Sequence, residues 1–115
     1  MIRKIIFFEN HFIEFYQKQN TKVKGKIQYV FELLKQVERV PEKFLKHLNG
    51  TNGLYEIRIE YQSNIYRIFC CFDKGKLVVL FNGLQKKSQK TPKKGIEKAQ
   101  KLMKSYFEQK DKGNG

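Results

Sequence analysis

The segment that follows residue 54 constrains the fold of this chain more than any other part of the sequence. Between Tyr55 and Tyr61, apolar and charged side chains alternate at every position, and a period of two is typical of a strand with one buried face. Two further runs rich in β-branched, aromatic and aliphatic residues follow at 65–72 and 77–84, entered through short turns at 62–64 and 73–75. Strands joined by such turns pair antiparallel. The sequence therefore predicts a three-stranded meander.

The remaining segments carry the signals of one more strand and of helices. Residues 2–8 have the composition of a strand. The predicted helical segments are a short helix at His11–Lys18, a longer helix capped by Thr21 and ended before Pro41, a helical turn within Glu42–Leu48, and a last helix opened by Thr91 and Pro92. We expect residues 111–115 to form a frayed tail.

This order of elements predicts an α+β domain. A small antiparallel sheet, made of the N-terminal strand and the meander, should carry the helices on one face. The other face should be at least partly free, and Arg58 and Arg67 should project from it. A chain of 115 residues supports one core rather than two, so residues 1–110 are predicted to form a single domain.

The charge of the chain points to an anionic partner. The sequence has 24 Lys and Arg residues against 11 Asp and Glu, which gives a formal net charge of +13. The excess is larger in residues 58–115, with 14 basic and 5 acidic side chains, than in residues 1–57, with 10 and 6. Such a balance favours nucleic acid or an acidic protein as partner over a merely soluble basic protein.

The cysteines and the apolar stretches indicate a reducing compartment. Cys70 and Cys71 are neighbours in a predicted strand, so they point to opposite faces and an ordinary disulfide between them is disfavoured. No second Cys or His pair has the spacing of zinc ligands, so we expect two small apolar core residues. The apolar run that ends at Phe8 is too short for a signal peptide, and no stretch is long enough to cross a membrane. We expect the protein in the cytoplasm.

Two arginines on predicted strands are candidates for binding an anion. Arg58 shares its strand face with Glu56 and Glu60, so a salt bridge and a functional role have about even odds. Arg67 has no acid in its own strand. An arginine among apolar side chains is expected to seek an anion, which favours a functional role.

Five lysines lie where the last strand passes into the last helix: Lys86, Lys87, Lys90, Lys93 and Lys94. The free N–H groups and the dipole of a helix N-terminus already favour phosphate, and lysines placed there strengthen the same site. We interpret Lys86 and Lys87 as functional. Lys93 and Lys94 are by default a solvated face that adds general affinity for RNA.

The sequence lacks the usual residues of acid–base catalysis. His11 and His47 have no Cys, Ser or acidic companion at a recognisable spacing. No nucleophile elbow, phosphate-binding glycine loop or paired-carboxylate motif is present, and we expect neither a metal nor a cofactor. An enzyme built on this chain would have to use another source of nucleophile.

The motifs LYEIR at 54–58, IYRIFCCFD at 65–73 and GKLVVLFNGLQKKSQKTP at 75–92 resemble the RelE/ParE toxin superfamily. The likeness is greatest to its phage-derived, HigB-like (Gp49-like) branch of type II toxin–antitoxin toxins, and it covers nearly the whole chain. It implies a RelE-like fold and a toxin that cleaves mRNA on the translating ribosome. It also implies a cognate antitoxin, expected to be a helix-turn-helix protein similar to HigA, and no membrane partner.

The resemblance also implies roles for the basic residues. In such an endoribonuclease the RNA 2′-hydroxyl is the nucleophile, so the protein must orient the phosphate and stabilise the developing charge. Arg58 and Arg67 would clamp the phosphate. Lys86 or Lys87 would take part in proton transfer, which arginine hardly can. The residues expected to bind RNA are Lys90, Lys93 and Lys94.

Two positions depart from the pattern of ribosome-dependent members. Glu56 stands where these proteins often carry a basic residue, and no tyrosine or histidine follows Lys87 closely. Two alternatives to mRNA cleavage therefore stay open: a non-enzymatic toxin of the ParE type that poisons gyrase, and a basic RNA-binding module.

Overall fold

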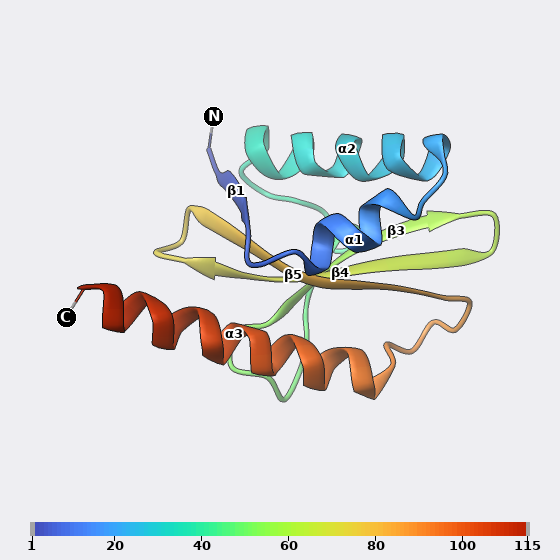
Figure 1. Cartoon of the computed structure of the whole chain (residues 1–115). Helices are drawn as coiled ribbons and strands as arrows, with labels where there is room; N and C mark the ends of the chain where they lie inside the picture. Colours follow the sequence, from blue (N-terminus) through green and yellow to red (C-terminus); the bar gives the residue numbers. More distant parts are fainter. Residues whose placement is uncertain (1, 115) are drawn as a thin grey trace.

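The computed structural model describes residues 2–114. Its elements in chain order are β1 (Lys4–Phe7), α1 (His11–Gln17), α2 (Thr21–Gln36), β2 (Leu45–His47), β3 (Tyr55–Tyr61), β4 (Asn64–Asp73), β5 (Leu77–Lys86) and α3 (Lys93–Asn114). Figure 1 shows them as one layered unit around a twisted sheet. No helix within the described residues is long and apolar enough to cross a membrane.

The five strands form one mixed sheet in the order β1-β5-β4-β3-β2. The three strands of the meander pair antiparallel, so the predicted α+β class and the meander are confirmed. β1 differs from the expected antiparallel pairing because it runs parallel to β5 and pairs Ile5 with Val78. Parallel pairing needs a long crossover connection, which the chain between these two strands supplies through α1 and α2.

The predicted helical turn within Glu42–Leu48 is wrong in its second half. Residues Leu45–His47 form β2, which pairs antiparallel with β3 and places Leu45 opposite Ile57. The backbone N–H of Arg58 also donates to the carbonyl oxygen of Phe44 at 2.9 Å. β3 would otherwise leave its backbone groups unpaired at the sheet edge, and pairing with it outweighs the weak helical preference of the segment.

Helices cover both faces of the sheet, which corrects the prediction of a single covered face. α1 and α2 lie on one side and α3 lies on the other (Figure 1). On the α2 side, Ile27 and Leu34 pack with Ile68, whereas on the α3 side Ala99 and Met103 pack with Phe69. The physical reason is present in the sequence, because β4 and β5 are apolar at nearly every position, and such a strand needs cover on both faces.

The two cysteines confirm the prediction of small apolar core residues. Cys70 lies in the core beneath α2 and Cys71 in the core beneath α3. Both thiols are free and buried. Burial raises the pKa of Cys71 to about 12 and raises the pKa of Cys70 as well. Both side chains therefore remain neutral thiols that fill space on opposite faces.

The helix ends differ from the predicted ones by a few residues. Asn20, not Thr21, caps α2, because its side chain accepts a hydrogen bond from the backbone N–H of Val23 at 2.9 Å. α2 ends at Gln36, and α3 begins at Lys93 and continues to Asn114. Residues 111–114, predicted to fray, are thus helical, and Gly115 lies outside the described residues.

Candidate nucleic-acid interface

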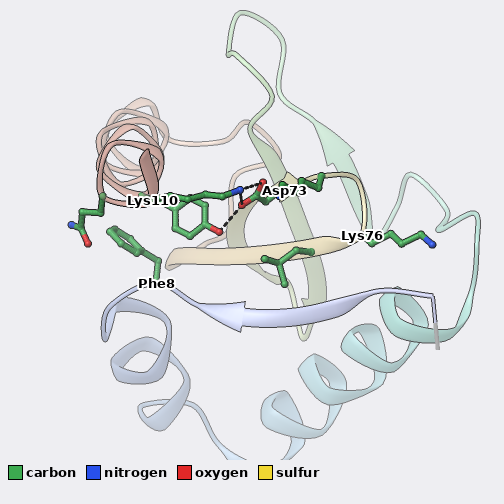
Figure 2. A pocket seen from close by; sticks show the side chains of 8 residues that line it. Phe8, Asp73, Lys76 and Lys110 are labelled. Carbon is green, nitrogen blue, oxygen red and sulfur yellow. Dashed lines mark hydrogen bonds and ion pairs between the residues drawn. The ribbon is translucent and has the colours of Figure 1, made fainter. Parts of the chain in front are cut away.

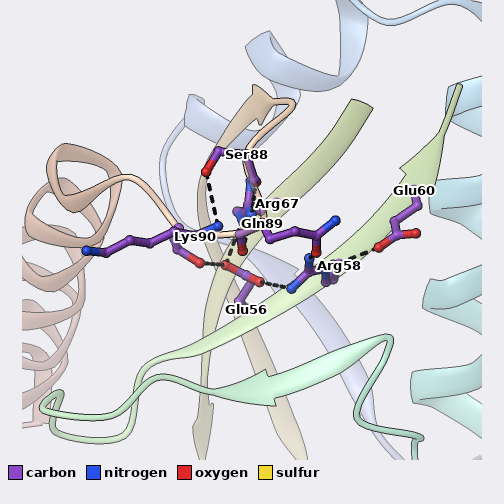
Figure 3. A network of polar contacts seen from close by, with 8 residues as sticks. Glu56, Arg58, Glu60, Arg67, Ser88, Gln89 and Lys90 are labelled. Carbon is purple, nitrogen blue, oxygen red and sulfur yellow. Dashed lines mark hydrogen bonds and ion pairs between the residues drawn. The ribbon is translucent and has the colours of Figure 1, made fainter. Parts of the chain in front are cut away.

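The two arginines of the sheet lie directly opposite each other, Arg58 on β3 and Arg67 on β4. Opposed residues of an antiparallel pair project from the same face. That face is the one that α3 covers, since Phe69 shares it two residues along β4. At this end of the sheet the cover is the segment between β5 and α3, residues 87–92, which we call the basic loop (Figure 3).

Arg67 anchors the basic loop to the sheet. Its side chain is 0% exposed, and its Nη2 donates to the carbonyl oxygens of Ser88 at 2.6 Å and Gln89 at 2.9 Å. Burial lowers the pKa of the guanidinium, and the nearby carboxylate of Glu56 opposes that change. Arg67 therefore has no surface left with which to touch a ligand in this conformation. The sequence predicts that Arg67 seeks an anion. In the structure that anion is the carboxylate of Glu56, whose Oε1 lies 3.2 Å from Nε of Arg67.

Glu56 joins the two arginines and the basic loop through one buried carboxylate. The hydroxyl of Thr91 donates to its Oε1 at 2.5 Å, so this hydroxyl serves the carboxylate and not the helix cap that the sequence predicts. Its Oε2 lies 3.8 Å from Nη1 of Arg58. Among the described residues, Oε2 of Glu56 and Nη1 of Arg67 have no hydrogen-bond partner. Electrostatic attraction therefore contributes much of the stability of this network. Loss of Glu56 or of Arg67 would leave the other buried charge without its nearest partner.

Arg58 is the more accessible of the two arginines. Its side chain is 14% exposed and its Nε lies 3.7 Å from Oε1 of Glu60. Its Nη2 donates to Oε1 of Gln89 in the basic loop. The salt-bridge interpretation of Arg58 is therefore confirmed. An anionic ligand could reach this guanidinium only by competing with Glu60 and Gln89.

The five predicted lysines are all exposed, and four of them line two hollows, whereas Lys94 lines neither. A hollow of about 580 Å³, which we call the lysine hollow, is lined by Lys86, Lys90 and Lys93 together with Pro92 and Ile96. Lys87 points elsewhere and lines a second hollow of about 210 Å³ beside the β3–β4 turn, which we call the hairpin hollow. The basic loop therefore presents cations on two sides.

The lysine hollow adjoins the N-terminus of α3. The first turn of this helix contains no acidic residue, and Lys93 and Lys94 stand in it, so the free N–H groups and the lysines all favour an anion. Ile96 and Pro92 give the hollow apolar surface between the charges. A ligand that combines phosphates with flat apolar groups, as nucleic acid does, matches this lining.

Sequence reasoning missed the residues that support the basic loop. The sequence assigns Thr91 to the start of the last helix and gives no role to Gln89, yet both hold the loop against the sheet. A signal was present in Glu56. It shares the strand face of Arg58, and once that face is covered, as it is in the structure, its carboxylate must find positive partners there.

A second polar cluster lies at the other end of α3 (Figure 2). Asp73, next to the β4–β5 turn, accepts hydrogen bonds from the hydroxyl of Tyr106 at 2.7 Å and from Nζ of Lys110 at 2.7 and 2.8 Å. These hydrogen bonds hold the pKa of Asp73 below its ordinary value, whereas burial and then the carboxylate raise the pKa of Tyr106 to about 12. The cluster fixes the C-terminal half of α3 on the sheet.

The Asp73 cluster predicts a pH dependence of stability. Because the folded-state pKa of Asp73 lies below its ordinary value of 3.8, its contribution is complete above that value and is lost as the pH falls through the lower folded-state value. Lys110→Met should therefore reduce the free energy of unfolding at neutral pH by about 1.5–3 kcal/mol. It should also flatten the loss of stability below about pH 4. Urea unfolding across a pH series measures both effects.

The control for this substitution is Lys112→Met, which removes the same charge from an exposed position of the same helix. This variant should keep both the stability and the pH profile of the wild type. Identical acid profiles for the wild type and Lys110→Met would contradict the assigned role of the cluster.

The family model of the phage-derived Gp49-like proteins matches residues 14–104. The chain belongs to this family. It is a family of RelE/HigB-like toxins, and membership is consistent with a toxin of a toxin–antitoxin pair and implies an antitoxin as partner. Among curated proteins, none matches the chain significantly. The match includes all of β3, β4, β5 and the basic loop.

Proposed function

We propose that this protein is the toxin of a type II toxin–antitoxin pair, similar to HigB, and that it blocks translation by cutting mRNA on the ribosome. The observation that carries the proposal is the lysine hollow, which a member of a toxin family presents beside a helix N-terminus. Three lysines around one hollow raise the local concentration of a polyanion. The proposed substrate is the sugar–phosphate backbone of a single RNA strand in the cytoplasm.

The proposed chemistry assigns different tasks to the basic residues. The RNA 2′-hydroxyl gives up its proton and attacks the adjacent phosphorus, and the bond from that phosphorus to the 5′-oxygen of the next nucleotide breaks. The departing 5′-oxygen takes up a proton, a 2′,3′-cyclic phosphate remains, and cations stabilise the charge that develops on the phosphate oxygens. Lys86, Lys90 and Lys93 line the hollow, and this position supports assigning them that task. Lys86 or Lys87 takes part in proton transfer. Arg58 is the arginine that a phosphate can reach, whereas the buried Arg67 acts by positioning the basic loop.

A specific observation favours a second function, a gyrase-poisoning toxin of the ParE type. Glu56 lies between Arg58 and Arg67, and Arg67 is fully buried. In this conformation the phosphate clamp that cleavage would use is occupied by an internal carboxylate. A basic surface without that clamp can still inhibit a target by binding to it.

The two functions are separated by expressing the chain in bacteria and following two readouts during growth arrest. Primer extension on a translated message reports mRNA cleavage, and a DNA-damage reporter reports chromosomal breaks. We expect cuts within the translated region and no DNA damage. Intact transcripts together with accumulating DNA breaks would replace the first proposal by the second.

We also propose how the antitoxin inhibits the toxin. Helices cover both faces of the sheet (Figure 1), so the partly free sheet face that the sequence predicts is not available to the partner. The exposed lysines of the basic loop and of the first turn of α3 remain. An acidic segment of the antitoxin that occupies the lysine hollow would block the site and would bind faster at low salt.

A further inference from the structure

An exposed aromatic residue stands on the side of the molecule opposite to α3. Tyr29 of α2 is 59% exposed, more than any other large hydrophobic residue among those described. Its ring lies edge-on to that of Phe44, with the ring centres 6.3 Å apart. The ammonium group of Lys43 lies 4.9 Å from the centre of the Phe44 ring. Two aromatic rings and a cation thus share one surface patch.

The patch continues along α2 toward the basic loop. Lys22, Lys26 and Tyr29 are spaced by four and three residues, which places them on one face of the helix. The ammonium group of Lys26 lies 5.8 Å from the centre of the Tyr61 ring at the end of β3. Tyr61 also lines the hairpin hollow, and so does Lys87 of the basic loop.

The arrangement of the elements agrees with this continuity. In Figure 1 the start of α2, the turn between β3 and β4, and the basic loop all lie at the same end of the molecule. Tyr61 and Lys26 connect the first two of these segments, and the hairpin hollow connects the second with the third. A chain of phosphates could therefore pass from Lys87 of the basic loop to Lys26 beside the aromatic patch. The acid on this path is Glu60, which lines the hairpin hollow and is paired with Arg58 at 3.7 Å.

The chemistry of the patch favours nucleic acid over a protein partner. Aromatic rings flanked by cations form the usual platform on which single-stranded bases stack. Protein interfaces are instead depleted in lysine at their centres, whereas lysines flank the rings of this patch. The acid one turn further along α2, Glu32, is paired with Lys35 at 3.5 Å, so its charge is partly compensated.

We propose that Tyr29 is a base-stacking residue for a single-stranded RNA segment whose neighbouring nucleotides are held by the basic loop. The inference rests on the proposed function, because it takes RNA as the ligand. It adds a second subsite, on α2, to the site at the lysine hollow. Tyr29 supplies stacking area, and Lys26 and Lys43 supply charge for the adjacent phosphates.

The test is the binding of a single-stranded RNA oligonucleotide, measured by fluorescence anisotropy across a salt series. Tyr29→Ala should weaken binding about tenfold, the size expected for one lost stacking contact. The slope of log affinity against log salt should stay unchanged, because no charge is removed. Tyr29→Phe, which keeps the ring, should bind as the wild type does, and Tyr29→Leu, which keeps only apolar area, should resemble Tyr29→Ala.

Each other result counts against the inference in a recognisable way. If Tyr29→Ala binds RNA as tightly as the wild type while Lys86→Ala/Lys87→Ala binds less tightly, the aromatic subsite is refuted and the proposed function survives. If the wild type binds no RNA oligonucleotide, the aromatic subsite is refuted, whereas the proposed function is decided separately by mRNA cleavage on translating ribosomes. If Tyr29→Ala loses only the antitoxin, the patch is a protein interface. Tyr29 is exposed, so circular dichroism should show all three variants folded.

Discussion

Replacing Arg67 by methionine should lower the free energy of unfolding by about 3–5 kcal/mol, a large part of the stability of a domain of this size. The substitution removes the nearer of the two arginines that pair with the fully buried Glu56, and leaves its carboxylate with only the more distant guanidinium of Arg58, at 3.8 Å. It also frees the carbonyl oxygens of Ser88 and Gln89, so the basic loop should become mobile. Urea unfolding followed by circular dichroism measures the loss.

The matched control for this prediction is a second substitution at the partner. Glu56→Leu combined with Arg67→Met replaces the buried pair by apolar side chains and should recover much of the lost stability, because no buried charge then remains. Lys94→Ala, at an exposed position, should change stability by less than about 0.5 kcal/mol. A loss below about 1 kcal/mol in Arg67→Met would show that this pair is not buried as described.

Neutralising the basic loop should have the largest effect on nucleic-acid binding. The triple variant Lys86→Ala, Lys87→Ala and Lys90→Ala should reduce the salt slope of single-stranded RNA binding by about 2, at roughly 0.7 per phosphate contact. At about 0.1 M salt that reduction corresponds to an affinity about 100-fold lower. Toxicity on expression should be lost as well.

An equal loss of charge from another surface serves as the control. The exposed α3 residues chosen for it are Lys98, Lys101 and Lys104. Alanine at these three positions removes the same total charge away from the lysine hollow, so both affinity and toxicity should fall much less. Equal losses in the two triple variants would mean that net charge, and not the basic loop, determines binding.

Local signals in the sequence predicted the meander well. Its two turns are formed by Gln62 with Ser63 and by Lys74 with Gly75, and all four residues have positive φ angles, as tight hairpins need. β2 and the parallel pairing of β1 were not predictable in the same way. The formation of β2 and the direction of β1 depend on which strand edge is open once the sheet has formed. The residues within these segments do not indicate which edge that is.

In the candidate site, too, features that depend on local sequence were predictable and features that depend on strand pairing were not. The exposed lysines at the end of the last strand were predictable, because lysines that are clustered in the sequence remain solvated and so form a charged surface in the folded protein. Arg67 was expected to seek a ligand because its own strand contains no acid. Its true partner, Glu56, lies diagonally across the strand pair, since Glu56 faces Phe69 and Arg58 faces Arg67. Only the register of two strands reveals such a contact.

The most direct test of the proposed function is to incubate the purified protein with ribosomes that are translating a defined mRNA and to map the new RNA ends. We expect cuts in the translated region only when ribosomes are present. Substitution of a 2′-deoxynucleotide at the cut position should abolish cleavage, because the 2′-hydroxyl is the proposed nucleophile. The triple lysine variant should leave the message intact. Uncut mRNA in reactions where the wild-type protein has stopped translation would contradict the account.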